Sequence, residues 1–167
     1  MMPQFFFTAA FVVALDQLVK ILIKTHMKLY TTVTIIPDIF NITYIENFGI
    51  AFGLTGQGEN QAKRWILCGV IFCAIILITV YWLKHPQKSF LFNFSLGLIT
   101  GGAIGNLIDR TLRGSVTDFL EVGFKQLSWP VFNLADSAVS AGVCLFVLYL
   151  IITKEHPVEV KNAPDTL

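Results

Sequence analysis

The chain has 167 residues, of which 54% are hydrophobic and 14% are charged, and its mean hydropathy is +0.67. Because a soluble domain has about 25% charged residues, this composition excludes an ordinary soluble domain and predicts an integral membrane protein. Twelve basic and eleven acidic residues leave a net charge of +1, so no polybasic surface predicts a nucleic-acid partner.

Four apolar stretches approach the roughly 20 residues that a helix needs to span a bilayer. They cover about residues 5–23, 65–83, 90–108 and 132–152. The first stretch contains Asp16 and Lys20, and it lacks a basic start and a small-residue cleavage site. We therefore expect it to stay in the protein as a helix and not to be removed as a signal peptide. The sequence predicts a mainly α-helical protein with four transmembrane helices.

Residues 31–60 differ from the apolar stretches, because β-branched and aromatic residues alternate there between a proline and several glycines. This pattern predicts a small β-sheet between the first and second helices, lying on one membrane face. We expect residues 1–153 to form a single transmembrane domain. Residues 154–167 are polar and contain two prolines, which predicts a disordered tail.

Four spans bring one set of polar residues to the same side of the membrane, whichever way the chain is inserted. The end of the first span, residues 31–60, the end of the third span and the start of the fourth all share that side. The polar residues there are Asp16, Lys20, Asn47, Asn106, Asp109, Arg110 and Asp136. An ionisable group at membrane depth is a functional-site candidate, so we expect a site where these residues converge.

The distribution of basic residues also predicts an orientation. The side with both termini has Lys84, Lys88, Lys154 and Lys161. The opposite side has Lys24, Lys28, Lys63, Arg64, Arg113 and Lys125, before Arg110 is counted. Taken alone, the positive-inside rule would place the polar side in the cytoplasm.

The polar residues of the first and third spans have structural and functional interpretations. Asp16 and Lys20 are one turn apart on a helix, so they can form an ion pair within the bundle or point together at a partner. Asp109 and Arg110 could likewise form a structural clamp or contact a substrate. Glycines recur at four-residue intervals in the third span, at positions 97, 101 and 105, and this spacing predicts close helix packing.

Asp118 and Asp136 are the strongest candidates for catalysis. Either residue alone could be a helix cap or a buried hydrogen-bonding group. Two close carboxylates cannot both ionise cheaply, so one of them retains a proton. The ionised member can then take a proton from water while the protonated member polarises a carbonyl. The pair therefore predicts hydrolysis by an aspartyl dyad.

Other catalytic machinery fits the sequence less well. The three histidines all lie outside the apolar stretches, and the three cysteines lack zinc-ligand spacing, so we expect no metal and no cofactor. A Ser–Lys dyad of Lys20 with Ser115 or Ser137 is conceivable, but it leaves both aspartates unexplained. A transporter subunit or a non-catalytic scaffold is a further alternative. The polar residues lie near one face and form no inverted repeat, which counts against transport.

Five motifs in register with the four spans closely resemble those of the bacterial lipoprotein signal peptidases, the type II signal peptidases. In chain order they are Asp16-Gln17-x-x-Lys20, Asn47-x-Gly49-x-Ala51-Phe52-Gly53, Gly101-Gly102-Ala103-x-Gly105-Asn106-x-x-Asp109-Arg110, Val116-x-Asp118-Phe119 and Phe132-Asn133-x-Ala135-Asp136. The resemblance covers residues 5–152. One departure is Ile50, where many members of the family have a small residue.

The resemblance implies an aspartyl peptidase that removes the signal peptide of prolipoproteins just before a cysteine that bears diacylglycerol. It implies that Asp118 and Asp136 are catalytic. The implied substrate-binding or supporting residues are Asp16, Lys20, Asn47, Gly102, Asn106, Asp109, Arg110 and Asn133. We expect Asn47 and the turn at residues 51–53 to act mainly in holding substrate.

The resemblance also implies a location. The protein would be a monomer among the lipids of the bacterial inner membrane, with both termini in the cytoplasm and the site near the outer face. This orientation overrides the count of basic residues, since anionic headgroups can retain some Lys and Arg outside.

Overall fold

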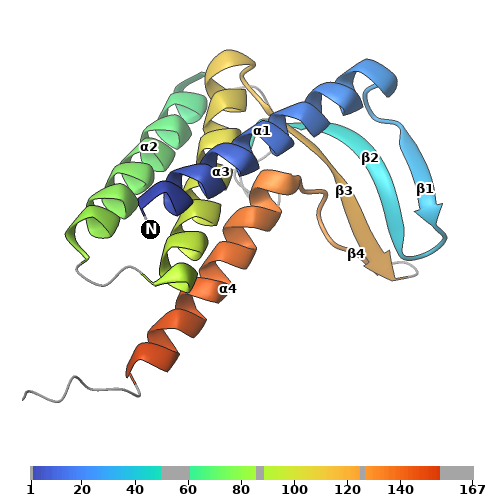
Figure 1. Ribbon diagram of the computed structural model, residues 1–167. Coiled ribbons are helices and arrows are strands. Elements are labelled where there is room, and N and C mark those ends of the chain that lie inside the picture. Colours follow the sequence, from blue (N-terminus) through green and yellow to red (C-terminus); the bar gives the residue numbers. More distant parts are fainter. Residues whose placement is uncertain (1, 50–60, 86–88, 125–126, 155–167) are drawn as a thin grey trace, which may run out of the picture.

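The computed structural model describes residues 2–49, 61–85, 89–124 and 127–154 (Figure 1). Its helices are α1 (Met2–His26), α2 (Gln61–Lys84), α3 (Phe90–Leu112) and α4 (Leu134–Lys154). All four are long and apolar enough to cross a membrane. The four predicted spans are confirmed, although α1, α2 and α3 extend beyond the predicted bounds and α4 begins and ends two residues later than predicted. The turn of the β segment at residues 51–53 and the tail from residue 155 lie outside the described residues.

Helix α3 is the centre of the bundle and packs against α1, α2 and α4. The spaced glycines explain how it can approach its neighbours. A Cβ atom on Gly101 would lie 2.8 Å from the carbonyl oxygen of Ala9 on α1. A Cβ atom on Gly102 would lie 2.3 Å from the carbonyl oxygen of Ala135 on α4. Glycine is therefore required on two sides of α3, where backbones meet without intervening side chains.

The sheet lies to one side of the bundle, beyond the C-terminal end of α1 (Figure 1). Its strands are β1 (Thr32–Ile36), β2 (Phe40–Asn47), β3 (Val116–Phe124) and β4 (Leu127–Ser128), in the order β1-β2-β3-β4. All neighbouring strands are antiparallel. The predicted small β-sheet between α1 and α2 is confirmed as the pair β1 and β2, but the sheet is not confined to that segment. The connection between α3 and α4, for which the sequence predicted no strands, supplies β3 and β4.

The pairing of β2 with β3 places two of the motifs side by side. Ile45 lies opposite Asp118 and Asn47 lies opposite Val116, after a register shift between Ile42 and Ile45. The Phe132 carbonyl accepts hydrogen bonds from the backbone of Phe119 at 2.9 Å and of Leu120 at 2.7 Å. The start of α4 is therefore held against β3, close to Asp118.

A small core joins the sheet to the end of α1. Ile23 on α1 packs with Tyr44 on β2 and Phe119 on β3, and all three side chains are buried. This core fixes the sheet relative to the helix that carries Asp16 and Lys20, because buried apolar contacts are the main stabilising term between elements.

Candidate active site

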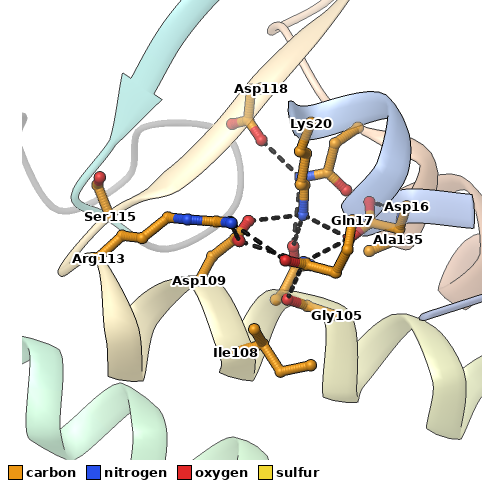
Figure 2. Close-up of polar contacts among 12 residues, drawn as sticks. Asp16, Gln17, Lys20, Gly105, Ile108, Asp109, Arg113, Ser115, Asp118 and Ala135 are labelled. Atoms are coloured by element: carbon orange, nitrogen blue, oxygen red, sulfur yellow. Dashed lines mark hydrogen bonds and ion pairs between the residues drawn. The ribbon is translucent and has the colours of Figure 1, made fainter. Parts of the chain in front are cut away.

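The predicted polar residues come together where α1, α3, β2, β3 and the start of α4 meet. Figure 2 shows part of this site, with Lys20 directed at the residues of α3 and Asp118 on the neighbouring strand. Nine of the ten predicted residues join one hydrogen-bonded network there; these nine are Asp16, Lys20, Asn47, Asn106, Asp109, Arg110, Asp118, Asn133 and Asp136. The tenth, Gly102, acts in helix packing.

Asp118 is buried, with 2% of its surface exposed. Its Oδ1 accepts a hydrogen bond from Asn133 Nδ2 at 2.7 Å, and its Oδ2 accepts one from Asn47 Nδ2 at 2.8 Å. Burial raises the pKa of Asp118 to about 7, with a further increase from the charge of Asp136, although the two asparagine bonds oppose the rise. Asp118 can therefore hold or release a proton near neutral pH.

Asp136 lies in the first turn of α4 and is only partly buried. Its Oδ1 accepts from Asn106 Nδ2 at 2.7 Å, and its Oδ2 accepts from the backbone N–H of Asn133 at 3.3 Å. In return, the backbone N–H of Asp136 donates to Asn133 Oδ1 at 2.9 Å. This reciprocal arrangement is a capping box, which fixes the carboxylate at the helix N-terminus.

Asn133 connects the two aspartates directly. Its side-chain amide donates to Asp118, and its backbone amide donates to Asp136. Since Asn133 is fully buried and its own side-chain oxygen is occupied by the capping bond, it has little freedom to rotate. The relative position of the two carboxylates is thus set by one residue.

The other two asparagines are also held with their amino groups toward the aspartates. Asn47 Oδ1 accepts from the backbone N–H of Gly49 at 2.9 Å, and the Gly49 carbonyl accepts from Arg110 Nη2 at 2.9 Å. Asn106 Oδ1 accepts from Lys20 Nζ at 3.3 Å. A donor at each amide oxygen leaves only the amino group to face a carboxylate. Asn47 therefore has a partner within the protein, and the expectation that it mainly holds substrate stays a prediction.

A buried ionic network supports this arrangement. Lys20 Nζ lies 2.8 Å from Asp16 Oδ2 and 2.8 Å from Asp109 Oδ2, and all three side chains are fully buried. Asp16 Oδ1 accepts from the backbone N–H of Ala135 at 3.0 Å, which ties α1 to α4. The expected Asp16–Lys20 pair is confirmed. Removing one partner would leave an uncompensated buried charge, a loss of about 3–5 kcal/mol.

Asp109 and Arg110 do not form the clamp that the sequence allowed. Among the described contacts, Asp109 pairs with Lys20 and Arg113, while Arg110 donates to Gly49. Neighbouring residues on a helix point in different directions, which explains the separation.

Two further residues of this network were not among the predicted site residues. Gln17 Nε2 donates to Asp109 Oδ1 and to the Gly105 carbonyl, each at 3.2 Å. Arg113 Nη1 donates to Asp109 Oδ1 and to Gln17 Oε1 (Figure 2). Gln17 belongs to the first motif and Arg113 lies four residues after Asp109, so both could have been found by helix spacing.

The geometry suits acid–base chemistry on a polar bond. The Asp118 carboxylate is buried and the Asp136 carboxylate is partly accessible. The asparagine amides around them all donate hydrogen bonds to one of the two. Within the described residues, no three His, Cys, Asp or Glu side chains are grouped as metal ligands would be. Water activation by the carboxylates themselves is the reaction that these groups support.

Comparison with known proteins identifies relatives along almost the whole chain. Residues 8–152 match the family model described as signal peptidase (SPase) II. The chain is 41% identical over 139 residues to the lipoprotein signal peptidase of Halothermothrix orenii, covering 83% of this chain and 89% of that protein. It is 38% identical over 140 residues to that of Syntrophotalea carbinolica, with 84% and 86% covered.

Solved structures agree with the sequence relatives. One bacterial membrane enzyme superposes with a TM-score of 0.82 at 28% identity, covering 99% of this chain and 96% of the other. A second bacterial membrane enzyme gives a TM-score of 0.78 at 30% identity, covering 98% and 96%.

Proposed function

The chain belongs to the signal peptidase II family, and from that membership we propose that Asp118 and Asp136 are its catalytic pair. The protein is a multi-pass membrane aspartyl peptidase that removes signal peptides from prolipoproteins. The observation that carries the catalytic assignment is the shared partner: Asn133 donates to Asp118 through its side chain and to Asp136 through its backbone.

The proposed reaction needs a single proton shared by the pair. The ionised carboxylate takes a proton from water as the water oxygen attacks the scissile carbonyl carbon, and the protonated carboxyl donates a hydrogen bond to the carbonyl oxygen. The tetrahedral intermediate then collapses, the C–N bond breaks, and a carboxyl proton passes to the leaving amine. The raised pKa of Asp118 supports a pair that keeps one proton near neutral pH.

The remaining site residues have supporting roles in this proposal. Asn47, Asn106 and Asn133 hold the carboxylates. Lys20 donates to Asn106, and Arg110 donates to the carbonyl of Gly49, whose N–H holds Asn47. Asp16 and Asp109 balance the charge of Lys20. Gly102 permits α4 to approach α3 closely enough for Asp136 to reach Asn106. Fixed donors in a region of low dielectric act more strongly than they would in water.

We also propose the setting of the reaction. The enzyme works as a monomer in the bacterial inner membrane, with residues 1–153 as one domain and the site near the outer face. A diacylglyceryl-modified prolipoprotein enters sideways from the bilayer, with its acyl chains in lipid and its peptide beside the sheet. Each buried methylene contributes about 0.8 kcal/mol, so two acyl chains outweigh any single side-chain contact in positioning the substrate.

The decisive experiment compares two forms of one prolipoprotein. Purified protein in lipid should shorten the diacylglyceryl-modified form by its signal peptide and leave the unmodified form nearly intact. Asp118→Asn and Asp136→Asn should abolish cleavage, whereas Asp38→Asn, at an exposed turn, should not. Equal cleavage of both substrate forms would refute the acyl-chain role, and full activity of either active-site variant would remove that aspartate from the mechanism.

A further inference from the structure

A second polar cluster lies beside the active site, on the opposite face of the β2–β3 ribbon. We call it the Glu46 cluster; it comprises Lys24, Tyr44, Glu46 and Ser115. Glu46 Oε1 accepts from Lys24 Nζ and from the Tyr44 hydroxyl, each at 2.8 Å, and Oε2 accepts from the Ser115 hydroxyl. One carboxylate therefore joins the end of α1 to β2 and to the turn that leads into β3.

The position of Glu46 relates it to the catalytic pair. It directly precedes Asn47, and it lies opposite Thr117, which directly precedes Asp118. Successive side chains on a strand point to opposite faces. The Glu46–Ser115 bond therefore crosses the two strands on one face, while the Asn47–Asp118 bond crosses the same strands on the other face.

The strand register at this point needs such a bond. Phe40, Asn41 and Ile42 pair with Val122, Glu121 and Leu120, but the register shifts before Ile45 pairs with Asp118. A slip of one residue turns every side chain to the other face of a strand. The pairs beyond the shift are therefore held by their own contacts, and the Glu46 cluster is one of those contacts.

Glu46 is ionised at neutral pH and can therefore keep its bonds to Lys24, Tyr44 and Ser115. Burial raises its pKa, but hydrogen bonds from Lys24, Ser115 and Tyr44 outweigh burial and leave the pKa below its ordinary value. Glu46 is thus ionised wherever the neutral-pH reaction proceeds, and its bonds to charged and hydroxyl donors are of the stronger class.

We propose that Glu46 is a positioning residue for the peptidase reaction: by joining Lys24 and Ser115, it holds Asn47 at the distance from which Asn47 donates to Asp118. This inference rests on the proposed catalytic role of Asp118. Glu46 touches neither substrate nor the reacting atoms. Its effect on turnover passes through Asn47.

The chain offers a matched control. Glu121 on β3 accepts from the Thr43 hydroxyl on β2 at 2.5 Å, across the same two strands. Glu121 pairs with Asn41 on the far side of the register shift, and Thr43 lies within the shift. Glu121→Ala removes a similar carboxylate–hydroxyl bond without touching the pairs next to Asp118. A loss of sheet stability alone would affect the two variants alike.

The test is a double-mutant cycle on cleavage of a diacylglyceryl-modified prolipoprotein. Glu46→Ala should lower kcat by about ten-fold or more with KM changed by less than about two-fold. Glu121→Ala should leave kcat within about two-fold of the parent. In an Asn47→Ala background, Glu46→Ala should have almost no further effect, because both changes remove the same bond to Asp118.

Each other outcome overturns the inference. Unchanged kcat in Glu46→Ala, an equal loss in Glu121→Ala, or additive losses with Asn47→Ala would each show that Glu46 does not act through Asn47. If Glu46→Ala does not accumulate, Ser115→Ala removes one hydroxyl, keeps the Lys24 pair and is subject to the same cycle. Cleavage by the parent protein is measured first: its absence would refute the proposed function, whereas normal cleavage with an unaffected variant would refute only the role of Glu46.

Discussion

Asparagine amides surround both aspartates, and these amides set how the pair titrates. Asp118 receives hydrogen bonds from Asn47 and Asn133, and both bonds lower a pKa that burial has raised. The resulting value of about 7 is a balance between desolvation and hydrogen bonding, so single substitutions can shift it in a known direction.

Asn47→Ala should shift the pH profile of cleavage. If Asp118 must hold the proton, activity falls as pH rises through the pKa of Asp118, which is raised to about 7. Removing the Asn47 bond removes a contribution that lowers this pKa, so the alkaline limb should move to higher pH while maximal turnover declines. The measurement is kcat/KM from about pH 5 to about pH 10, a range that covers both the acidic and the alkaline limb of the pH profile. A limb that moves to lower pH would contradict the assigned hydrogen bond.

Asp118→Asn should lower turnover without lowering the stability of the fold. Burial raises the pKa of Asp118 in the folded protein from its ordinary value of 3.8 to about 7, so the folded protein loses stability as pH rises between these two values. An asparagine at this position does not ionise, so the variant escapes this loss of stability. The thermal unfolding midpoint of Asp118→Asn at pH 8 should equal or exceed that of the parent protein, and the two midpoints should differ less near pH 4. Turnover should fall by several orders of magnitude, at about 1.4 kcal/mol of barrier per decade.

The double variant with Asp136→Asn should be little worse than either single variant, because the proposed mechanism uses the two aspartates as a unit. Asp38→Asn, which changes an exposed carboxylate, controls for the loss of one charge. A clear drop in the midpoint of Asp118→Asn at pH 8 would show that the ionised carboxylate stabilises the fold and would contradict the raised pKa.

Most of the site residues could be predicted from the sequence, but their contacts could not. Motifs and helix spacing identified Asp16, Lys20, Asp118 and Asp136. The direction in which each asparagine amide points depends on donors from other elements, such as Lys20 for Asn106. Glu46 was missed because its partners Lys24 and Ser115 lie 22 and 69 residues away, and no local pattern marks such a bond.

Among the elements, α3 decides how close the proposed catalytic residues and their partners can come. It faces α1 through Gly97, Gly101 and Gly105, and it faces α4 through Gly102. Asn106 and Asp109 lie one turn beyond these contacts. A helix that could not approach both neighbours would leave Asp16 and Asp136 out of reach of its polar end.

Gly102→Ala should impair activity through helix packing. The added Cβ would lie 2.3 Å from the Ala135 carbonyl and 2.7 Å from Val139 Cγ2, so α4 must shift, and the Asp136–Asn106 bond with it. Overpacking of this kind typically costs about 1–3 kcal/mol. Both the midpoint temperature of thermal unfolding, measured in detergent, and kcat should decrease.

The control is Gly69→Ala on α2, where a Cβ would meet no atom within 4 Å. This change should be neutral or stabilising by up to about 1 kcal/mol, since alanine favours a helix more than glycine does. Similar losses in both variants would mean that helix propensity and not the approach of α4 explains the effect.

The strand β3 shows where prediction of an element fails. Its burial pattern does not alternate at the start, because Val116, Thr117, Asp118 and Phe119 are all buried, so the usual period-two signal is absent. Its partner β2 lies about 75 residues earlier in the chain. The strand forms because a neighbour is available in the fold, and only the hairpin of β1 and β2 had a local sequence signal.

At the scale of the whole molecule, the number of spans was predictable because length and hydropathy alone determine it. The same count implied that all polar motifs share one side, and the network of α1, α3, α4 and the sheet confirms their convergence. The orientation was not determined in this way, because the basic residues and the family resemblance point to opposite sides of the membrane.

The orientation is the last prediction, and it can be tested with single cysteines in a background that lacks Cys68, Cys73 and Cys144. Thr34 is exposed on β1, and Lys84 is exposed at the end of α2. Because one bilayer crossing by α2 separates the sheet side from the end of that helix, the two positions must lie on opposite sides. With the site near the outer face, Thr34→Cys should react with a membrane-impermeant thiol reagent in intact spheroplasts. Lys84→Cys should react only after the membrane is opened.

Both variants should retain cleavage activity, since neither residue contacts the catalytic network, and this activity verifies that the labelled protein is correctly folded. The reverse labelling pattern would place the sheet and both aspartates in the cytoplasm, as the positive-inside count alone predicts. Labelling of both positions before the membrane is opened would instead contradict the crossing by α2.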